Sequence, residues 1–223
     1  MRPLAAYATL VFDCDGVILD SNRVKTAAFR QVALPHGEAA AEALVAYHIR
    51  HGGVSRYRKF EHFIGGILGR APDAVLLQEL LDRFAAEVRR GLLECEIAAG
   101  LAALRATTPA SRWLVVSGGD QEELRWLFSH RGIAELFNGG IFGSPDTKSR
   151  ILGREISAGN VAMPALFLGD SRLDYEAAAG AGLDFLFVSG WTEFDEWKSL
   201  QKVESFPSVA GLKSLISGGE FGQ

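Results

Sequence analysis

The stretch ATLVFDCDG, residues 8–16, decides the fold of this chain. Residues 8–13 form a short and mostly apolar run, closed by acidic residues and by Gly16. A continuous apolar run of this length is typical of a strand buried on both faces of a parallel sheet. We therefore expect residues 8–13 to form the first strand. Asp13 and Asp15 stand two positions apart, so in an extended chain they face the same way.

Four further apolar runs of strand length follow later in the chain, with helical patterns between them. The runs are residues 113–116, 140–143, 165–168 and 185–188, and the helical patterns are residues 121–130, 147–157 and 172–181. Alternating strands and helices predict βαβ units around a parallel sheet. The expected fold is α/β with a Rossmann-like, doubly wound sheet. Right-handed crossovers bring the carboxyl ends of its strands to one edge, where α/β proteins bind ligands.

The segment between the first two strands has a different pattern, with several helical stretches and little clustering of β-branched residues. These stretches are residues 24–34, 42–49, 60–68 and 76–88, with breaks at Gly52-Gly53 and Ala71-Pro72. We expect two domains: an α/β catalytic core of residues 1–16 and 91–223, and an α-helical domain of residues 17–90. The helical domain is inserted over the carboxyl edge of the sheet.

Composition excludes several classes of protein. The formal net charge of −4 argues against a nucleic-acid binder that relies on overall charge. Cys14 and Cys95 are the two cysteines and form no CxxC pair, which argues against a disulfide framework or a zinc site and favours a reducing cytoplasm. No apolar run approaches the roughly 20 residues of a membrane helix. We expect no nucleic-acid or membrane partner, and nothing in the sequence indicates an oligomeric state.

Acidic residues follow two of the expected strands. Asp13 and Asp15 follow the first, whereas Asp170 and Asp174 open the helix after residues 165–168, one helical turn apart. Four carboxylates that converge repel one another unless a cation is present. Oxygen ligands without sulfur point to Mg²⁺. Each aspartate alone could instead be a helix cap or a loop residue, but four together after apolar runs favour a metal site.

Two other segments at this edge suit an anion. Lys148 lies in the first turn of an expected helix that Asp146 or Thr147 caps, where a cation opposes the helix dipole. It either neutralises a phosphate or the nucleophile, or it is a surface lysine. Ser117 and Gly118 lie between a strand and a helix, where the hydroxyl and backbone N–H groups form an anion cradle. The alternative is an ordinary glycine-rich turn. Asp120 with Glu123 resembles a capping box at the start of that helix.

Taken in order, these motifs resemble those of the haloacid dehalogenase superfamily. The first and last are specific together, and the middle two are weak alone; the motifs are Asp13-Cys14-Asp15-Gly16-Val17 with Asp20-Ser21, Ser117, Lys148, and Gly169-Asp170-Ser171-Arg172-Leu173-Asp174. The helical insertion resembles the family's cap placed after the first motif, as in relatives of phosphoglycolate phosphatase and β-phosphoglucomutase.

The resemblance implies a mechanism and a function. It makes Asp13 the nucleophile that forms an aspartyl-phosphate, and Asp15 the general acid and then the general base. Mg²⁺ would bind Asp13, the Asp15 carbonyl and Asp170, and Asp174 would orient Lys148 or a water. Ser117, Gly118 and Lys148 would hold the phosphoryl oxygens. The expected protein is a Mg²⁺-dependent phosphatase for a small phosphorylated metabolite, such as a sugar phosphate or a phosphoglycolate-like compound.

Specificity in such enzymes comes from the cap, where Arg56 is the candidate residue. It ends the string Gly-Val-Ser-Arg, which resembles the cap loop of β-phosphoglucomutase-like enzymes and keeps a phosphomutase as the alternative. A haloacid dehalogenase and a non-catalytic binding protein are weaker alternatives. We expect Arg58, Lys59 and the nearby histidines to form a solvated basic face. Asp20 and Ser21 are expected to cap the first cap helix, and residues 191–197 to belong to an amphipathic helix.

Overall fold

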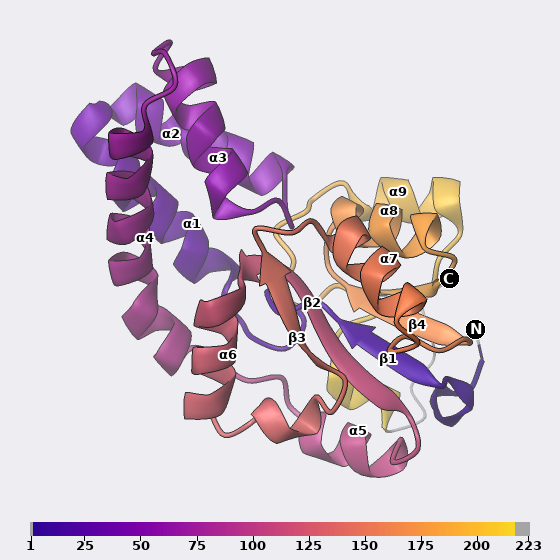
Figure 1. Ribbon diagram of the computed structural model, residues 1–223. Helices are drawn as coiled ribbons and strands as arrows, with labels where there is room; N and C mark the ends of the chain where they lie inside the picture. Colours follow the sequence, from indigo (N-terminus) through magenta and orange to yellow (C-terminus); the bar gives the residue numbers. More distant parts are fainter. Residues whose placement is uncertain (1, 217–223) are drawn as a thin grey trace.

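A computed structural model describes residues 2–216 (Figure 1). Its described strands form one six-stranded parallel sheet in the order β3-β2-β1-β4-β5-β6. The expected α/β class and the five expected strands are confirmed, and a two-residue sixth strand was not expected. The strands are β1 (Thr9–Phe12), β2 (Arg112–Asp120), β3 (Gly140–Ser144), β4 (Ala165–Gly169), β5 (Asp184–Val188) and β6 (Ser208–Val209).

Strand β1 lies at the centre of the sheet and sets the position of the site. It pairs with β2 on one side and β4 on the other, and Phe12 is in register with both Val115 and Leu168. From β1 the chain adds strands first in one direction and then in the other. The region next to β1 is therefore the topological switch point, and a crevice outside the carboxyl ends of the strands is expected there.

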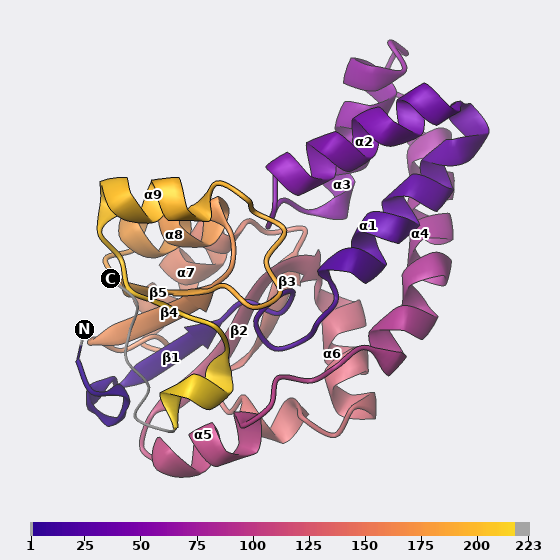
Figure 2. The ribbon, with the colours of Figure 1, turned by 180° about the vertical axis from the view of Figure 1, so that it is seen from behind.

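Helices cover both faces of the sheet, because successive residues of each buried strand face opposite sides. In β1, Leu10 and Phe12 pack with residues of α5 and α6, whereas Val11 packs with α7, α8 and α9. The two helical layers are visible from opposite sides in Figures 1 and 2. These helices are α5 (Leu101–Thr107), α6 (Gln121–His130), α7 (Lys148–Ser157), α8 (Arg172–Gly180) and α9 (Trp197–Glu204), with 3-10 turns at Leu4–Ala6, Leu34–His36, Ala134–Leu136 and Leu212–Leu215.

The expectation of a helix over residues 191–197 was wrong, because α9 begins only at Trp197 and residues 191–196 form a loop. Thr192 explains this difference. Its hydroxyl donates to the Asp170 carbonyl at 2.6 Å and accepts from the Phe194 N–H at 3.0 Å. These bonds hold the segment in a turn beside the end of β4 rather than in a helix.

Four helices between β1 and β2 form a group of their own, which we call the helical unit (residues 22–94). Figure 1 shows it, in indigo to purple, beyond one edge of the sheet. Phe29, Phe60 and Phe84 pack together within it, with ring centroids 4.3 to 5.8 Å apart. The unit comprises α1 (Asn22–Ala33), α2 (Glu38–Arg50), α3 (Arg56–His62), a π-helical turn (Phe63–Ile67) and α4 (Ala74–Glu94). Among the helices of residues 2–216, none is long and apolar enough to cross a membrane.

Candidate active site

Asp13 is the first residue after β1, and the sheet buries it at the switch point. The residue is 3 % exposed. The Cys14 N–H donates to one carboxylate oxygen at 2.7 Å, and the Lys148 ammonium lies 2.9 Å from the other. Burial raises the pKa of Asp13 to about 7, with a further rise from the nearby Asp174 carboxylate, against the lowering effect of Lys148.

Lys148 reaches Asp13 from α7, which the Thr147 hydroxyl caps as one of the two expected residues. The lysine is buried and pairs with both Asp13 and Asp174. Burial alone would lower the pKa of Lys148, but the two carboxylates raise it above its ordinary value. Lys148 is therefore a fixed positive charge beside Asp13.

Asp174 uses both its oxygens within the protein. One oxygen faces Lys148, and the other accepts from the Asp170 N–H at 3.2 Å, the Ser171 N–H at 3.0 Å and the Ser171 hydroxyl at 2.6 Å. The Ser171 hydroxyl in turn accepts from the Asp174 N–H, which completes a capping box at the start of α8. Asp174 thus fixes the turn that carries Asp170 and orients Lys148.

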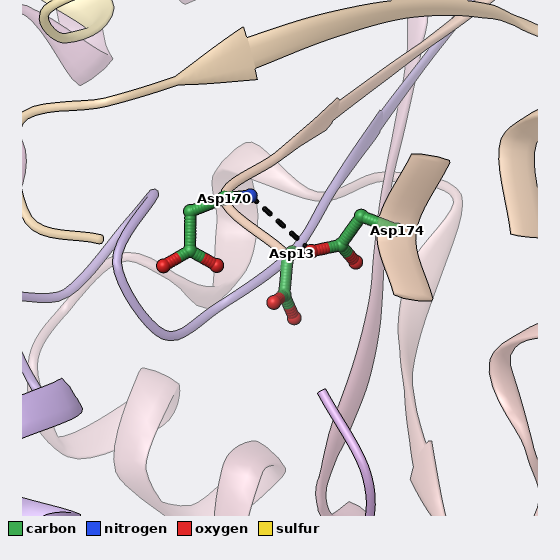
Figure 3. Close-up of side chains that lie close together, drawn as sticks. All are labelled: Asp13, Asp170 and Asp174. Carbon is green, nitrogen blue, oxygen red and sulfur yellow. Dashed lines mark hydrogen bonds between the residues drawn. The ribbon is translucent and has the colours of Figure 1, made fainter. Parts of the chain in front are cut away.

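Three buried carboxylates come together at this edge, as Figure 3 shows for Asp13, Asp170 and Asp174. Each offers one oxygen, and these oxygens lie within 4.8 Å of one another. Burial and then the Asp13 charge raise the pKa of Asp170 well above its ordinary value. A buried, oxygen-only set of this kind fits a hard divalent cation. Gly16 packs directly against this cluster. It has a φ of 73°, and a side chain there would meet the Asp170 carboxylate at 2.1 Å.

The Asp15 side chain lies outside this cluster and faces the helical unit. Its carboxylate accepts from the Ser21 hydroxyl at 2.5 Å and pairs with Lys25 at 2.6 Å. Burial would raise the pKa of Asp15, but Lys25 and the Ser21 hydrogen bond lower it overall. Ser21 stands at the N-cap of α1 as expected, but its hydroxyl donates to Asp15 and makes no cap hydrogen bond.

Ser117 and Gly118 lie near the end of β2, and Gly118 faces the helical unit. The buried Ser117 hydroxyl accepts from the Gly119 N–H at 3.0 Å. A side chain at Gly118 would meet the backbone oxygen of Gly53 at 2.1 Å. The loop between α2 and α3 therefore closes directly over the expected phosphate cradle.

Arg56, the predicted specificity residue, joins the helical unit to the sheet. It is 7 % exposed, pairs with Glu123 of α6 and stacks over the Phe84 ring at 4.7 Å. The expected capping box of α6 is half present: Asp120 accepts from the Glu123 N–H at 2.9 Å, but the Glu123 carboxylate pairs with Arg56 instead of the Asp120 backbone. Asp120 also accepts from the Tyr57 hydroxyl at 2.7 Å.

A pocket lies between the helical unit and the sheet. Its cavity volume is about 60 Å³, which suits a small ligand. Asp13, Asp15 and Asp170 line it from the sheet side and the loop of residues 192–194 lines its rim; the helical unit contributes Asn22, Lys25, Phe29, His48, Arg56 and Lys59 among others. Asn22 reaches across and donates to Asp170 at 2.8 Å.

The expectation of a solvated face was wrong for Lys59 and His48, which are 2 % and 8 % exposed. The Lys59 ammonium lies 2.7 Å from the His48 Nδ1. The face of α3 that carries Lys59 also carries Arg56, three residues earlier, and is turned toward the pocket. The three-residue spacing of Arg56 and Lys59 could have indicated that both face the pocket. The surrounding basic residues hid which side chains of this stretch point inward. Arg58, by contrast, is exposed as expected.

The family comparison agrees with this fold. The model of the haloacid dehalogenase-like hydrolases matches residues 7–182, which is most of the chain. The fold and this match define an enzyme that catalyses hydrolysis. The chain belongs to the haloacid dehalogenase-like hydrolase family, as the order of motifs predicts. None of the curated proteins gives a significant match.

Solved structures share the fold at low identity. A haloacid dehalogenase-like hydrolase of Bacteroides fragilis has a TM-score of 0.70 at 21 % identity, covering 94 % of this chain and 100 % of its own. A predicted phosphatase of Clostridium acetobutylicum has a TM-score of 0.71 at 16 % identity, covering 95 % and 97 %. A predicted phosphoglycolate phosphatase of Haemophilus somnus has a TM-score of 0.63 at 17 % identity, covering 82 % and 85 %.

Proposed function

We propose that this protein is a Mg²⁺-dependent phosphatase that hydrolyses a small phosphorylated metabolite through an aspartyl-phosphate on Asp13. The observation that carries the proposal is the Asp13 carboxylate, held against Lys148 at the floor of the pocket. A carboxylate in this position attacks phosphorus, and the fixed lysine favours its ionised form against the effect of burial. The solved relatives described as phosphatases support the same reaction class.

Asp15 is the proposed acid and base. In the first step the Asp13 oxygen bonds to phosphorus, the bond from phosphorus to the substrate oxygen breaks, and Asp15 gives that oxygen a proton. In the second step water attacks the phosphorus and gives a proton to the Asp15 carboxylate, which frees phosphate and restores Asp13. The contacts with Lys25 and Ser21 favour the ionised form of Asp15 that the second step needs. A phosphate group beside it opposes them and favours the protonated form.

The remaining site residues divide between the cation and the phosphoryl group. Mg²⁺ would be held by the Asp13 and Asp170 carboxylates and the Asp15 carbonyl, and Asp174 would keep Lys148 and the turn at Asp170 in place. When bound, the cation supplies positive charge to the phosphate oxygens. Ser117, the Gly118 N–H and Lys148 are proposed to hold those oxygens from the protein side.

We also propose that the helical unit is a cap domain that selects the substrate, with Arg56 among its specificity residues. It meets the sheet over the pocket and is joined to it through residues 13–21 and 95–100. The proposed cap domain keeps the expected bounds of residues 17–90. The small pocket supports a small metabolite, such as a sugar phosphate or a phosphoglycolate-like compound. Two free cysteines support a cytoplasmic location.

The first test is release of p-nitrophenol from p-nitrophenyl phosphate with Mg²⁺ or with EDTA. We expect activity that depends on Mg²⁺ and is abolished in Asp13→Asn, while circular dichroism shows the variant folded. Activity that survives EDTA would contradict the cation site. A fully active Asp13→Asn enzyme would exclude Asp13 as the nucleophile.

A phosphomutase is the second candidate, and the closed loop over Gly118 is the observation that favours it. A mutase must keep water from the aspartyl-phosphate while a substrate hydroxyl takes the phosphoryl group. The two functions differ in the fate of ³²P-labelled enzyme. Transfer to an added sugar phosphate, faster than loss to water, would identify the mutase, whereas rapid loss to water would identify the phosphatase.

A further inference from the structure

The helical unit presents three basic side chains to the pocket, and two of them already have an acidic partner. Lys25 lies 2.6 Å from an Asp15 oxygen, and Arg56 pairs with Glu123. Lys59 is different: within the described residues, no carboxylate lies within ion-pair distance of its ammonium group. Its partners are the His48 ring nitrogen and the face of Phe29, whose centroid lies 5.4 Å away.

His48 does not neutralise this lysine. It is buried, and burial together with Lys59 and Lys25 lowers the pKa of His48 well below its ordinary value, so the ring is uncharged. The Lys59 ammonium donates to Nδ1, which fixes the position of the amine. A charge that is buried without an opposite charge is costly. The pocket is therefore short of one negative charge at Lys59.

The position of Lys59 decides what can supply that charge. It lies on α3 in the wall formed by the helical unit, whereas Lys148 lies on α7 behind Asp13. On the sheet side, Lys148 supplies the positive charge that balances the phosphoryl group attacked by Asp13. The leaving group of the same substrate extends toward the helical unit, because that unit forms the other wall of the pocket.

We propose that Lys59, held in place by His48, binds a second anionic group on the leaving-group part of the substrate. This inference rests on the proposed phosphatase function and narrows its substrate class. The anion is a carboxylate or a second phosphate, because either would accept charge-assisted hydrogen bonds from the ammonium. A phosphorylated metabolite with an uncharged leaving group would leave Lys59 without its partner.

The test compares substrates in matched pairs. One pair is 2-phosphoglycolate and 2-hydroxyethyl phosphate, which differ in a carboxylate against a hydroxymethyl group. The other is glucose 1,6-bisphosphate and glucose 1-phosphate, which differ in a second phosphate. We expect wild-type enzyme to prefer the doubly anionic member of one pair by about tenfold or more in kcat/KM, which is the scale of one charge-assisted hydrogen bond. The pair that shows this preference identifies the anion.

Variants then assign the preference to Lys59. We expect Lys59→Met to reduce the ratio of kcat/KM within that pair by about tenfold, and Lys59→Arg to keep most of it, since the charge remains. Arg58→Met removes an exposed charge one residue away and is expected to leave the ratio unchanged.

Two results would overturn the inference while leaving the phosphatase intact. One is a wild-type enzyme that hydrolyses p-nitrophenyl phosphate but shows no preference within either pair. The other is a Lys59→Met variant that keeps the full preference. An enzyme that hydrolyses none of these esters would instead overturn the proposed function, and the inference with it.

Discussion

Lysine serves two opposite purposes in this pocket, and the difference lies in its partners. Lys148 is buried between two carboxylates, which raise its pKa above the ordinary value despite burial. Lys59 is equally buried but has only an uncharged imidazole and a ring beside it. Burial, followed by repulsion from Lys25, lowers the pKa of Lys59 to about 7. Lys148 is therefore a permanent positive charge of the site, whereas Lys59 is placed to bind an anionic group of the ligand.

The lowered pKa of Lys59 predicts a specific effect on stability. The amine titrates near 7 when folded and near 10.5 when unfolded, so between these values the unfolded chain binds the extra proton. The free energy of unfolding therefore rises with pH between about 7 and 10.5. Below about pH 7, Lys59 destabilises the folded protein to its full extent. Lys59→Met removes the cost, and we expect it to raise the free energy of unfolding at pH 6 by roughly 1–3 kcal/mol, after allowing for the lost bond to His48.

Urea unfolding of wild type and Lys59→Met at pH 6 and pH 9.5 measures this effect. The gain at pH 6 is expected to shrink at pH 9.5. The groups whose charges act on Lys59 are Lys25, Asp15, Lys148 and Glu193, and none is altered by the substitution. Arg58→Met is the matched control, with no pH-dependent gain expected. A Lys59→Met protein that is less stable at both pH values would mean that the lysine is paired in the folded protein.

At the scale of elements, two close approaches of backbone position the site. Gly16 lets the turn after β1 pass against the Asp170 carboxylate, and Gly118 lets the loop between α2 and α3 rest on the end of β2. The second contact joins backbone to backbone, since the atom nearest to a Gly118 side chain would be the Gly53 oxygen at 2.1 Å. No rotation of a side chain relieves such a clash, so the loop itself must move.

Gly118→Ala is therefore expected to displace the loop of residues 52–54 from the pocket. Because a misplacement of about 1 Å can reduce turnover by about 100-fold, we expect a large loss of kcat/KM. Melting temperature should fall only slightly, since the loop can move away as a whole. Gly153→Ala is the matched control: Gly153 lies in α7 with no atom within 4 Å of an added side chain, so stability rises by about 0.5–1 kcal/mol with activity unchanged. An active Gly118→Ala enzyme would show that the loop position does not matter for catalysis.

The elements that the sequence predicted well are those whose signal is local. Strand β1 and its neighbours are continuous apolar runs, and α7 carries the expected cap at Thr147. Strand β6 has two residues, too few to give a pattern. The aromatic residues of the segment 191–196 suggested an amphipathic helix. The hydrogen bond from Thr192 to Asp170, which is distant in sequence, holds the segment in a loop instead. The burial of Lys59 likewise depends on contacts between α3 and α1, which no local pattern records.

At the scale of the molecule, polar contacts hold the helical unit over the sheet. Arg56 and Tyr57 of α3 pair with Glu123 and Asp120 at the start of α6, and Thr26 of α1 donates to Glu193 at 2.7 Å. Lys25 pairs with Asp15 on the same side of the pocket. Apolar packing accompanies these contacts: Arg56 stacks over Phe84, and the phenylalanine cluster of the helical unit belongs to the same continuous core as Leu10 and Phe12 of β1. The interface therefore combines polar contacts at the pocket with a shared apolar core.

Glu123→Gln tests whether the Arg56 contact keeps the helical unit closed. Loss of one member of a buried ion pair costs about 3–5 kcal/mol when the remaining charge stays buried. The Glu123→Gln variant can avoid this cost, because separation of the helical unit from α6 exposes the Arg56 charge to water. We expect the variant to open rather than unfold: the radius of gyration from X-ray scattering rises, KM rises for small phosphate esters, and the melting temperature changes little. Tyr57→Phe removes only a neutral hydrogen-bond donor from the same contact and should have a weaker effect in the same direction. A large fall in melting temperature with an unchanged radius of gyration would instead make the Arg56–Glu123 pair part of one rigid core, with no opening for the substrate at this interface.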